Sequence, residues 1–379
     1  MIVLEGVFWL ASALLFYEAA GYPLLLRVWA KLARRRSLAA PYPPGEEPLV
    51  SLVVAAHDEE SVIARKVADA HAQDWPAHRL EVIVCSDGST DATVAQARAA
   101  GAEVVLDLPR GGKVRAQDAG VEQARGEIVA FGDANALWEP DALRELAAAF
   151  GDPEVGYACG QVRFVNEEGT NQEGLYWRYE MALRALESRL ASVTAGNGAI
   201  YATRREAYLV VDPIMGHDLS FPFNMVKRGW RAVYAPRARA QEKMVPSIEG
   251  EFARKRRMMS HAWPIVLRGG MLSPRGYGPA YALMIVSHRL LRYAAPFLHL
   301  LALGANVALV VAGGGTIYVI TLAAQLALLA GAALAGRVRS RPLLMARYYV
   351  LTRASVALGL WDWLRHGTAA GWDAAEGTR

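Results

Sequence analysis

The sequence predicts an α/β fold, with a mostly parallel sheet in the middle of the chain and apolar, membrane-spanning helices at both ends. Strand-like and helix-like segments alternate from Leu49 to Phe150, and apolar residues concentrate near the two ends of the chain. The composition is 53% hydrophobic and 21% charged, with a mean hydropathy of +0.14, which is high for a wholly soluble protein. A chain of 379 residues is long enough for one large domain with appendages.

The first apolar segment, residues 2 to about 26, is long enough to cross a bilayer despite Glu5 and Glu18. A signal peptide would carry its positive charge before the apolar core and a small-residue cleavage site after it. Here the basic residues follow the core: Arg27, Lys31, Arg34, Arg35 and Arg36. We therefore expect a retained anchor over residues 1–30, with the chain after it in the cytoplasm by the positive-inside rule. Residues 31–48 read as a basic, Pro-rich linker.

A soluble domain is predicted over residues 49–245. Its first segment, "LVSLVVAA", is an unbroken Val-rich run typical of a strand buried on both faces. The following pattern predicts, in order, a helix at 59–73, a strand at 80–86, a helix from near Asp91, a strand at 102–108, a helix at 113–123, a strand at 127–133 and a helix at 140–150. This alternation predicts a mostly parallel sheet with helices on both faces, whose ligands bind at the carboxyl ends of the strands.

Polar residues fall at those strand ends. Asp58 follows the first strand, Asp87 ends the second, and Asp133 and Asn135 follow the fourth. No Gly-x-Gly-x-x-Gly loop or Walker A sequence is present, so the common dinucleotide and P-loop sites are excluded. A nucleotide bound at these strand ends would be held by carboxylates and a divalent metal, Mg²⁺ or Mn²⁺, which prefers oxygen ligands.

The remaining composition excludes other classes of protein. The two cysteines, Cys85 and Cys159, lie in predicted strands and form no disulfide framework or zinc motif. The net charge of +4 includes basic clusters, but no nucleic-acid-binding motif accompanies them, so we expect membrane lipids as partners and no nucleic acid.

The C-terminal third predicts further membrane segments. Residues 246–290 mix Gly, Pro, Arg and aromatics and read as an interfacial amphipathic segment. Transmembrane helices are expected over 291–366, with spans at about 293–312 and 315–335 and basic residues on one common side, which places both of their ends in the cytoplasm. The stretch 343–364 contains arginines, and the sequence leaves open whether it spans or lies in the interface. Residues 367–379 form a tail.

Four motifs stand in order in the soluble domain: "VSLVVAAHDEE", "VIVCSDGSTDAT", "GGKVRAQDAG" and "GEIVAFGDAN…PDAL". As a set they resemble family 2 glycosyltransferases, including the membrane-integral cellulose and hyaluronan synthase relatives, from about Leu49 to Met259. The resemblance implies a GT-A fold, a nucleotide-diphosphate sugar as donor and a divalent metal. A nucleotidyltransferase has a similar sheet but usually a Gly-rich N-terminal loop, which "VVAAHDEES" does not offer.

The resemblance implies roles for the donor side of the site. Asp87 would accept hydrogen bonds from the donor's base or ribose, although Asp is also a common turn and N-cap residue. Asp58, which replaces the family's usual Asn, would line the nucleotide pocket. Lys113 opens a helix after a Gly pair and would bind the diphosphate, unless it is a solvated lysine. Asp133 matches the first aspartate of the DxD motif, and Asn135 replaces the second, so the metal would lose one negative ligand.

Roles on the acceptor side follow in the same way. "TAGNGAIYATRRE" matches the segment that forms the acceptor wall, where Gly196, Asn197 and Gly198 would let the backbone approach the sugar. Asp218 would be the catalytic base in "MGHDLS", where the family commonly has Glu-Asp. His217 would lie on the acceptor side, tuning the base or binding metal, or it would simply pack.

The family's Gln/Arg-x-x-Arg-Trp motif would fall at "RKRRMM", with Met258 in place of the Trp. Arg254 and Arg257 have its spacing and would hold the donor diphosphate; the alternative is a basic patch that faces acidic lipid headgroups. Trp263 would supply an acceptor contact.

These observations lead to one expected function and two alternatives. We expect an inverting glycosyltransferase that moves a sugar from a nucleotide-diphosphate sugar, UDP-linked, to a lipid-linked saccharide or growing glycan. It would lie in a bacterial-type inner membrane as a multi-pass protein with a cytoplasmic catalytic domain. The alternatives are a processive polysaccharide synthase, and a non-catalytic nucleotide-binding subunit with polysaccharide export partners.

Overall fold

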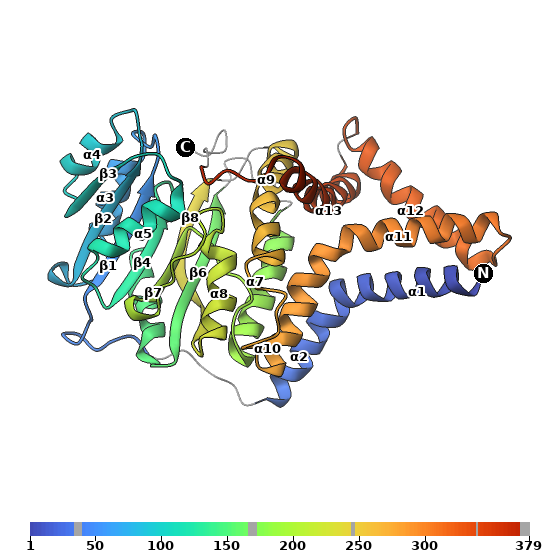
Figure 1. The fold of residues 1–379 in the computed structure, drawn as a ribbon, viewed down its shortest axis with the longest axis horizontal. Coiled ribbons are helices and arrows are strands. Elements are labelled where there is room, and N and C mark those ends of the chain that lie inside the picture. Colours follow the sequence, from blue (N-terminus) through green and yellow to red (C-terminus); the bar gives the residue numbers. More distant parts are fainter. Residues whose placement is uncertain (34–39, 166–172, 244–246, 339, 372–379) are drawn as a thin grey trace. The chain divides into compact units, whose positions relative to one another are not determined.

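The computed structural model describes residues 1–33, 40–165, 173–243, 247–338 and 340–371 (Figure 1). Arg34 to Arg36, Arg339, the end of the predicted catalytic domain at 244–245 and the tail from 372 onward lie outside these residues. The chain divides into two compact units, each described below by itself. The sheet unit comprises residues 32–246, 264–282 and 368–379, and the helical unit comprises 1–31, 247–263 and 283–367.

The sheet unit contains an eight-stranded sheet with the order β3-β2-β1-β4-β7-β6-β8-β5 (Figure 1). Its strands are β1 Val50–Ala56, β2 Leu80–Asp87, β3 Val104–Leu108, β4 Ile128–Asp133, β5 Leu137–Trp138, β6 Val155–Val165, β7 Ile200–Arg204 and β8 Arg231–Lys243. The pairs β1–β2, β1–β4, β2–β3 and β6–β8 are parallel, whereas β4–β7, β6–β7 and β5–β8 are antiparallel. The predicted α/β class with a mostly parallel sheet is confirmed.

Helices cover both faces of this sheet because the inner strands are apolar on both sides. Leu52 and Val54 of β1 pack into one core cluster, with side chains from α3, α4 and α6, while Val53 and Ala55 pack into the other, with side chains from α5, α7 and α8. The helices are α3 Ile63–His71, α4 Thr93–Ala99, α5 Lys113–Gln123, α6 Ala142–Ala147, α7 Glu173–Leu190 and α8 His217–Lys227, with 3-10 turns at Ala77–Arg79, Ala148–Gly151 and Arg205–Ala207.

Two features of the sheet unit differ from the expected elements. The helix expected at 59–73 begins only at Ile63, because the backbone of the preceding residues is bonded to another loop. The antiparallel strand β7 lies between β4 and β6, so the segment that precedes it reaches the edge where β4 ends. This insertion brings the predicted donor and acceptor segments to one edge of the sheet.

The helical unit contains long apolar helices. α1 Ile2–Phe16, a π-helical turn at Tyr17–Gly21 and α2 Tyr22–Leu32 form one run. α10 Pro279–Met284, a π-helical turn at Ile285–Leu290 and α11 Leu291–Val311 form another, and α12 Thr316–Leu334 follows. The helical unit includes the first run up to residue 31 and the second from residue 283. These three runs are the ones in the described part of the chain that are long and apolar enough to cross a membrane. Residues 279–290, expected in an interfacial segment, are therefore continuous with a candidate span.

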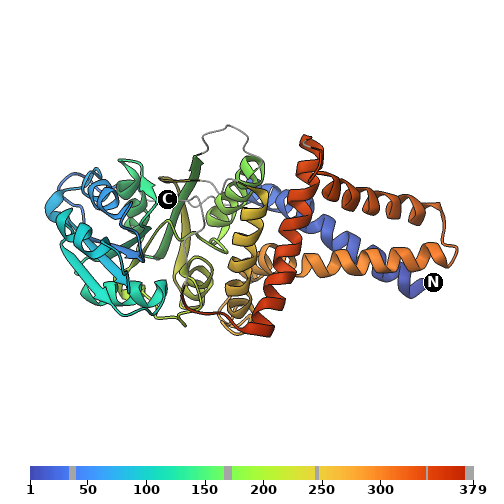
Figure 2. The same ribbon diagram turned by 90° about the horizontal axis from the view of Figure 1, so that it is seen from above.

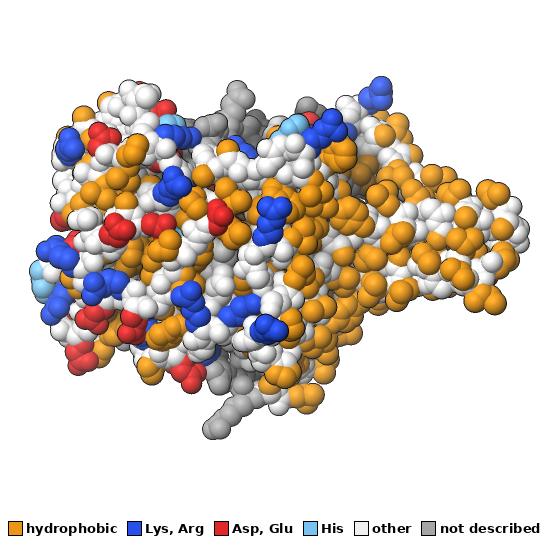
Figure 3. Space-filling model, viewed as in Figure 1, with side chains coloured by type: hydrophobic (Ala, Val, Ile, Leu, Met, Phe, Trp, Pro, Cys, Tyr) orange, Lys and Arg blue, Asp and Glu red, His pale blue; other side chains and the backbone are white. Residues whose placement is uncertain are grey.

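Apolar side chains cover the outside of these helices. Figure 3 shows hydrophobic side chains gathered over α1, α11 and α12. On these helices, side chains that are more than half exposed include Val3, Leu10, Phe16, Leu300 and Ile320. Such a surface is stable in lipid and not in water. Between the helices, Phe8 and Ala11 of α1 pack on α11, and the turn at 312–315 returns the chain as α12 (Figure 2).

Two further helices complete the helical unit. These are α9 Ile248–Leu267, up to Trp263, and α13 Arg341–His366, which is not among the three candidate spans. α13 is tied to the first run by a buried ion pair, in which the Arg353 guanidinium donates to both carboxylate oxygens of Glu18 at 2.7 and 3.2 Å. This pair explains how two charges are accommodated between apolar helices, since buried charges must be paired.

Candidate functional site

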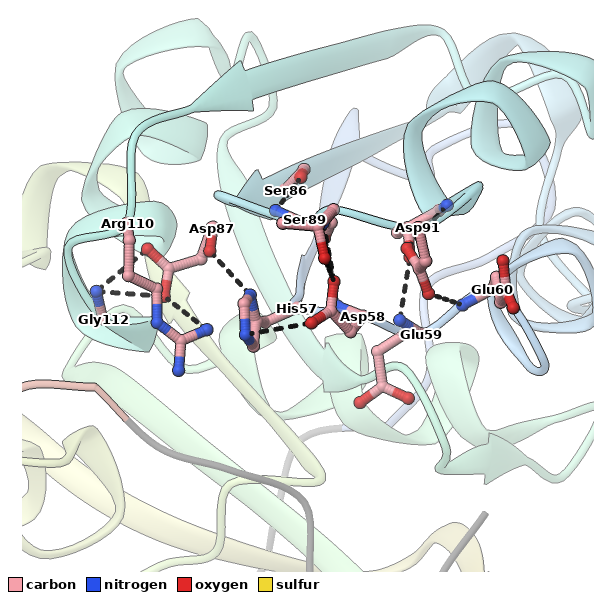
Figure 4. Close-up of polar contacts among 12 residues, drawn as sticks. His57, Asp58, Glu59, Glu60, Ser86, Asp87, Ser89, Asp91, Arg110 and Gly112 are labelled. Carbon is pink, nitrogen blue, oxygen red and sulfur yellow. Dashed lines mark hydrogen bonds and ion pairs between the residues drawn. The ribbon is translucent and has the colours of Figure 1, made fainter.

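Two loops at the carboxyl ends of β1 and β2 are bonded to each other (Figure 4). The Asp58 N–H donates to Ser89 Oγ at 3.1 Å, and the Thr90 N–H donates to Asp58 Oδ1 at 2.7 Å. Asp58 has a φ of 50°, the left-handed region that non-glycine residues rarely adopt. The resemblance gives Asp58 a place in the nucleotide pocket, and the structure places it half-exposed at the sheet edge and bonded to the neighbouring loop.

Asp91, in the second loop, serves the helix that follows it. Its carboxylate accepts hydrogen bonds from the N–H groups of Thr93, at 3.0 Å, and Glu60, at 3.0 Å, as well as from the Thr93 hydroxyl. Burial works to raise the pKa of Asp91, but these hydrogen bonds from Thr93 and Glu60 hold it below its usual value. Asp91 therefore anchors the start of α4.

Asp87, at the end of β2, organises a third loop. Its buried carboxylate accepts the N–H of Gly111 at 2.6 Å and the N–H of Gly112 at 2.9 Å, and the Arg110 guanidinium lies 3.8 Å away (Figure 4). Gly112 has a φ of 96°, which a residue with a Cβ rarely adopts. Asp87 thus holds the loop directly before Lys113, whatever further hydrogen bonds its carboxylate accepts from a ligand.

Lys113, Asp133 and Gly198 meet at the end of β4. The Lys113 ammonium forms a salt bridge with the Asp133 carboxylate. A Cβ built on Gly198 would lie 3.2 Å from Lys113 Nζ and 3.7 Å from Asp133 Oδ2. The structure therefore brings together a predicted phosphate-binding cation, a predicted metal ligand and a residue of the predicted acceptor wall.

Asn197 and Gly196 hold that wall by backbone contacts. The Asn197 side-chain amide donates to Gly160 O at 2.8 Å, and its oxygen accepts the Ile200 N–H at 2.9 Å. The Gly196 N–H donates to Asp218 O at 2.7 Å. This last bond places the acceptor segment against the first turn of α8, which carries the predicted base and whose dipole favours a negative charge at that end.

Gly196 also has a packing role that the sequence does not reveal. A Cβ at this position would lie 1.9 Å from Tyr157 Oη, so the space of the missing side chain is filled by the Tyr157 hydroxyl. The group that lies close to Gly196 is thus the Tyr157 side chain of the protein's own core.

His217 is buried in a group of aromatic rings. It stacks on Phe221 with ring centroids 3.9 Å apart, and its Nδ1 lies 2.8 Å from the Tyr201 hydroxyl. Phe131 and Tyr208 contact it edge-on. Burial, assisted by the positive charge of Lys113, lowers the pKa of His217 to about 3, so its imidazole is neutral at neutral pH. These contacts are those of a packed, hydrogen-bonded histidine.

The three predicted residues on α9 belong to the helical unit. Arg254 donates to both carboxylate oxygens of Glu251, one turn earlier, at 2.7 and 2.8 Å. Arg257 lies on the same helix. Trp263 is buried: its indole N–H donates to Val356 O at 2.9 Å, and its ring contacts Tyr293 edge-on.

Sequence reasoning missed the residues that hold the predicted acceptor segment and the Asp87 loop in place. On α7, the Arg184 guanidinium donates to Gly196 O at 2.9 Å, and the buried Glu187 carboxylate accepts the Thr194 hydroxyl at 3.0 Å. Arg110, beside Asp87, was also not singled out. A spacing of three on a helix shows that Arg184 and Glu187 share a face, but not that this face meets residues 194–196.

Asp133 and Asn135 are the two oxygen donors expected for a divalent metal. Asp133 ends β4 and Asn135 lies in the turn before β5, both half-buried. In the described part of the chain no three His, Cys, Asp or Glu side chains are grouped as a metal cage. Two oxygen donors nonetheless fit Mg²⁺ or Mn²⁺ shared with a substrate, because such ions are commonly held by one or two protein ligands plus phosphate oxygens and water.

Comparisons with known proteins agree with this architecture. Residues 51–210 match the family described as Glycosyl transferase family 2. The chain is 28% identical over 229 residues to an N-acetylglucosaminyltransferase of Rhizobium leguminosarum bv. viciae, a match that covers 55% of this chain and 54% of that protein. It is 33% identical over 170 residues to the Beta-monoglucosyldiacylglycerol synthase of Synechocystis sp., covering 40% of this chain and 33% of that protein. The chain thus spans about half the length of the first of these relatives and a third of the second.

Among solved structures, the chain is similar to the mannosyltransferase PcManGT from Pyrobaculum calidifontis, which was solved in complex with GDP-Man and Mn²⁺. The TM-score is 0.75 and the sequence identity 24%, with 96% of this chain and 99% of that chain covered. At this identity the similarity shows the fold, and the expected GT-A fold is confirmed.

Proposed function

Since residues 51–210 of this chain are a family 2 glycosyltransferase domain, we propose that the protein is an inverting transferase that moves a sugar from a UDP-sugar to a lipid-linked saccharide or glycan at the cytoplasmic face of a membrane. The enzyme class, a nucleotide-sugar glycosyltransferase, follows from the family and its relatives. The donor nucleotide, the acceptor, the stereochemistry and the membrane face are the proposed part.

The observation that carries the proposal is the meeting of Lys113, Asp133 and Gly198 at the end of β4. One backbone hydrogen bond, from Gly196 to Asp218, connects this cluster's acceptor segment to the predicted base. A single-displacement transfer needs these groups close together, because the base and the leaving-group cation act on opposite sides of one anomeric carbon.

In the proposed reaction the acceptor hydroxyl oxygen forms a bond to the anomeric carbon while the bond from that carbon to the diphosphate oxygen breaks. Asp218 takes the hydroxyl proton, and the electron pair of the broken bond leaves with the nucleoside diphosphate. Attack opposite the leaving group inverts the anomeric centre. One base and one stabilised leaving group are sufficient for this chemistry.

Lys113 supports the leaving group by its charge. Lys113 is the first residue of α5, and the N–H groups at the start of this helix also favour binding of an anion. A divalent ion held by Asp133 and Asn135 would supply further positive charge to the diphosphate when bound. We propose that on donor binding Lys113 exchanges part of its salt bridge with Asp133 for the phosphate oxygens.

Membrane attachment argues for an acceptor that is itself in the membrane. The three candidate spans and their exposed apolar side chains fit a protein embedded in lipid. A relative is named for making a glucosyldiacylglycerol, a lipid product. With the basic residues after the first run on the cytoplasmic side, a soluble nucleotide sugar would reach the sheet unit from the cytoplasm. Arg254 and Arg257 are proposed contacts of acidic lipid headgroups. Trp263 is buried within the helical unit, where its indole N–H donates to Val356 O, and we do not propose it as an acceptor contact.

The test is donor hydrolysis and transfer by the full chain in detergent, with a panel of UDP-, GDP- and dTDP-sugars, membrane lipid extract and Mn²⁺. Asp218→Asn is expected to bind the preferred donor normally and to lose at least about 100-fold in turnover. Asp212→Asn, at an exposed position in the preceding loop, is the matched control and should keep full activity.

Binding without turnover by the wild type would contradict the enzyme proposal and favour a nucleotide-binding subunit. A product that carries many sugar units would favour the processive synthase over the single addition that we expect. Turnover by Asp218→Asn at the wild-type rate would exclude Asp218 as the base.

A further inference from the structure

A lysine lies wholly buried beneath the turn that joins β4 to β5. Lys66, on α3, has 0% relative exposure, and its ammonium donates to Ala136 O at 2.7 Å. The same ammonium lies 3.3 Å from the Asp69 carboxylate and 4.8 Å from the centroid of the Trp138 ring. A cation is rarely buried to this extent unless specific partners compensate it.

Asp69, one turn further along α3, binds the same segment. Its carboxylate accepts the Trp138 N–H at 3.0 Å. The pair therefore uses a donor and an acceptor to fix the main chain on both sides of Leu137, directly after Asn135. The Trp138 indole then donates to Ala199 O at 3.1 Å, next to Gly198 of the acceptor wall.

From these contacts we propose that Lys66 and Asp69 are positioning residues that hold the 133–138 turn in the shape in which Asp133 and Asn135 present their oxygens to a divalent cation and the donor diphosphate. This inference rests on the proposed function and adds to it two residues outside all the motifs.

The contacts favour this role over a purely structural one. The other inward residues of α3 are Ile63, Val67 and Ala70, which pack into the apolar core. Packing of this helix on the sheet therefore does not require a charged residue at position 66. Burial lowers the pKa of Lys66, an effect that the Asp69 and Asp133 carboxylates oppose. The cost of burying this ammonium is thus offset by Asp69 on the same helix, by the Ala136 carbonyl of the turn and by Asp133, the predicted metal ligand.

Residues that orient the ligands of a metal ion without contacting the ion themselves typically contribute 10- to 100-fold to the metal affinity. Asn135 makes the support more important, because a neutral amide ligand adds no charge to compensate for poor placement. If the turn is free to shift, the binding of the cation should be weakened more than the binding of the nucleotide, because the nucleotide also contacts the β1 and β2 loops in the proposed site.

The experiment measures binding, on the full chain in detergent, with Mn²⁺ and UDP as probes. Mn²⁺ affinity in the presence of UDP is followed by electron paramagnetic resonance, UDP affinity in EDTA by calorimetry, and the melting temperature by fluorescence. Lys66→Met keeps the length and packing of the side chain, and Asp69→Asn keeps an acceptor for the Trp138 N–H. Lys227→Met is the control, because Lys227 also donates to two backbone carbonyls, of Gly270 and Ser273, away from the turn.

We expect Lys66→Met to weaken Mn²⁺ binding by about 10-fold or more, and Asp69→Asn by a smaller factor, while UDP affinity in EDTA changes by less than about threefold. Lys227→Met should lower the melting temperature and leave Mn²⁺ binding unchanged. If Lys66→Met does not fold, Asp69→Asn decides the question.

Variants that fold and bind Mn²⁺ as the wild type does would overturn the inference. So would an equal loss of Mn²⁺ and of metal-free UDP binding. A wild-type protein that binds no nucleotide would contradict the proposed function instead, and so the two failures can be distinguished.

Discussion

Replacing Gly196 by alanine tests the packing at the acceptor segment. The new Cβ would lie 1.9 Å from Tyr157 Oη and 2.9 Å from its Cζ, where about 3.5 Å is needed, so something must move by more than 1 Å. Tyr157 is fully buried and stacked on Tyr201. Gly196 is itself held by its bonds to Asp218 and Arg184.

Overpacking of this kind costs about 1–3 kcal/mol, and the rigidity on both sides places Gly196→Ala near the upper end. At about 2–4 °C per kcal/mol for a domain of this size, the melting temperature should fall by about 6–12 °C. Tyr157→Phe alone should change it little, because the hydroxyl has no hydrogen-bond partner among the described residues. In the double variant the oxygen is gone and roughly half of the loss should be recovered.

The assay is thermal unfolding of the full chain in detergent, combined with donor turnover. Gly278→Ala is the control, since a Cβ there meets nothing within 4 Å. The reasoning is refuted if Gly196→Ala melts within about 2 °C of the wild type, or if Tyr157→Phe fails to restore any of the loss.

Three further predictions concern other parts of the sheet unit. Asp87→Asn should weaken nucleotide binding by about 10-fold in calorimetry, because an amide N–H would face the Gly112 N–H where a charged oxygen now accepts it; unchanged affinity would exclude the loop-holding role. His217, whose pKa burial lowers from 6.5 to about 3, stays neutral in the folded protein while the unfolded chain takes up a proton. Stability contributed by this group is therefore present above about pH 6.5 and is lost as the pH falls from there toward about 3. His217→Gln, which cannot titrate, should flatten that part of a plot of melting temperature against pH, and an unaltered slope would contradict the assignment. Cys85, whose thiol pKa burial raises to about 12, and the buried Cys159 should react with a maleimide only on unfolding, as mass spectrometry would show.

The sequence predicted the strands of the nucleotide half well because each is a Val-rich run bounded by turn residues. β1, β2 and β4 lie within a residue of their expected bounds. Asp87 and Asp133 could be singled out because each ends such a strand, and Lys113 because it follows a Gly pair at the start of a helix. The helix expected at 59–73 began late, since the polar residues before Ile63 bond to a loop about 30 residues away, which no local pattern encodes.

The supporting residues could not be predicted for the same physical reason. Lys66 reads as a polar residue on an amphipathic helix, and only the fold shows that it faces Ala136, 70 residues later. Tyr157 and Gly196 are 39 positions apart and meet because β6 and the segment before β7 pack together. Residues 279–290 were expected in an interfacial segment because that part of the chain mixes Gly, Pro and Arg with aromatics. In the structure they are continuous with the candidate span Pro279–Val311, and His288 and Arg289 are buried inside the helical unit.

The reciprocal bonds between the β1 and β2 loops have a dynamic consequence. The N–H groups of Asp58 and Thr90 each donate to a side chain of the other loop. The N–H groups of Glu60 and Ala92 do the same two residues further along each loop. Neither loop can open without breaking bonds that belong to the other, so the two should fluctuate as one cooperative unit. Hydrogen exchange of these four amides should follow a common rate, and a nucleotide that contacts either loop should slow exchange in both.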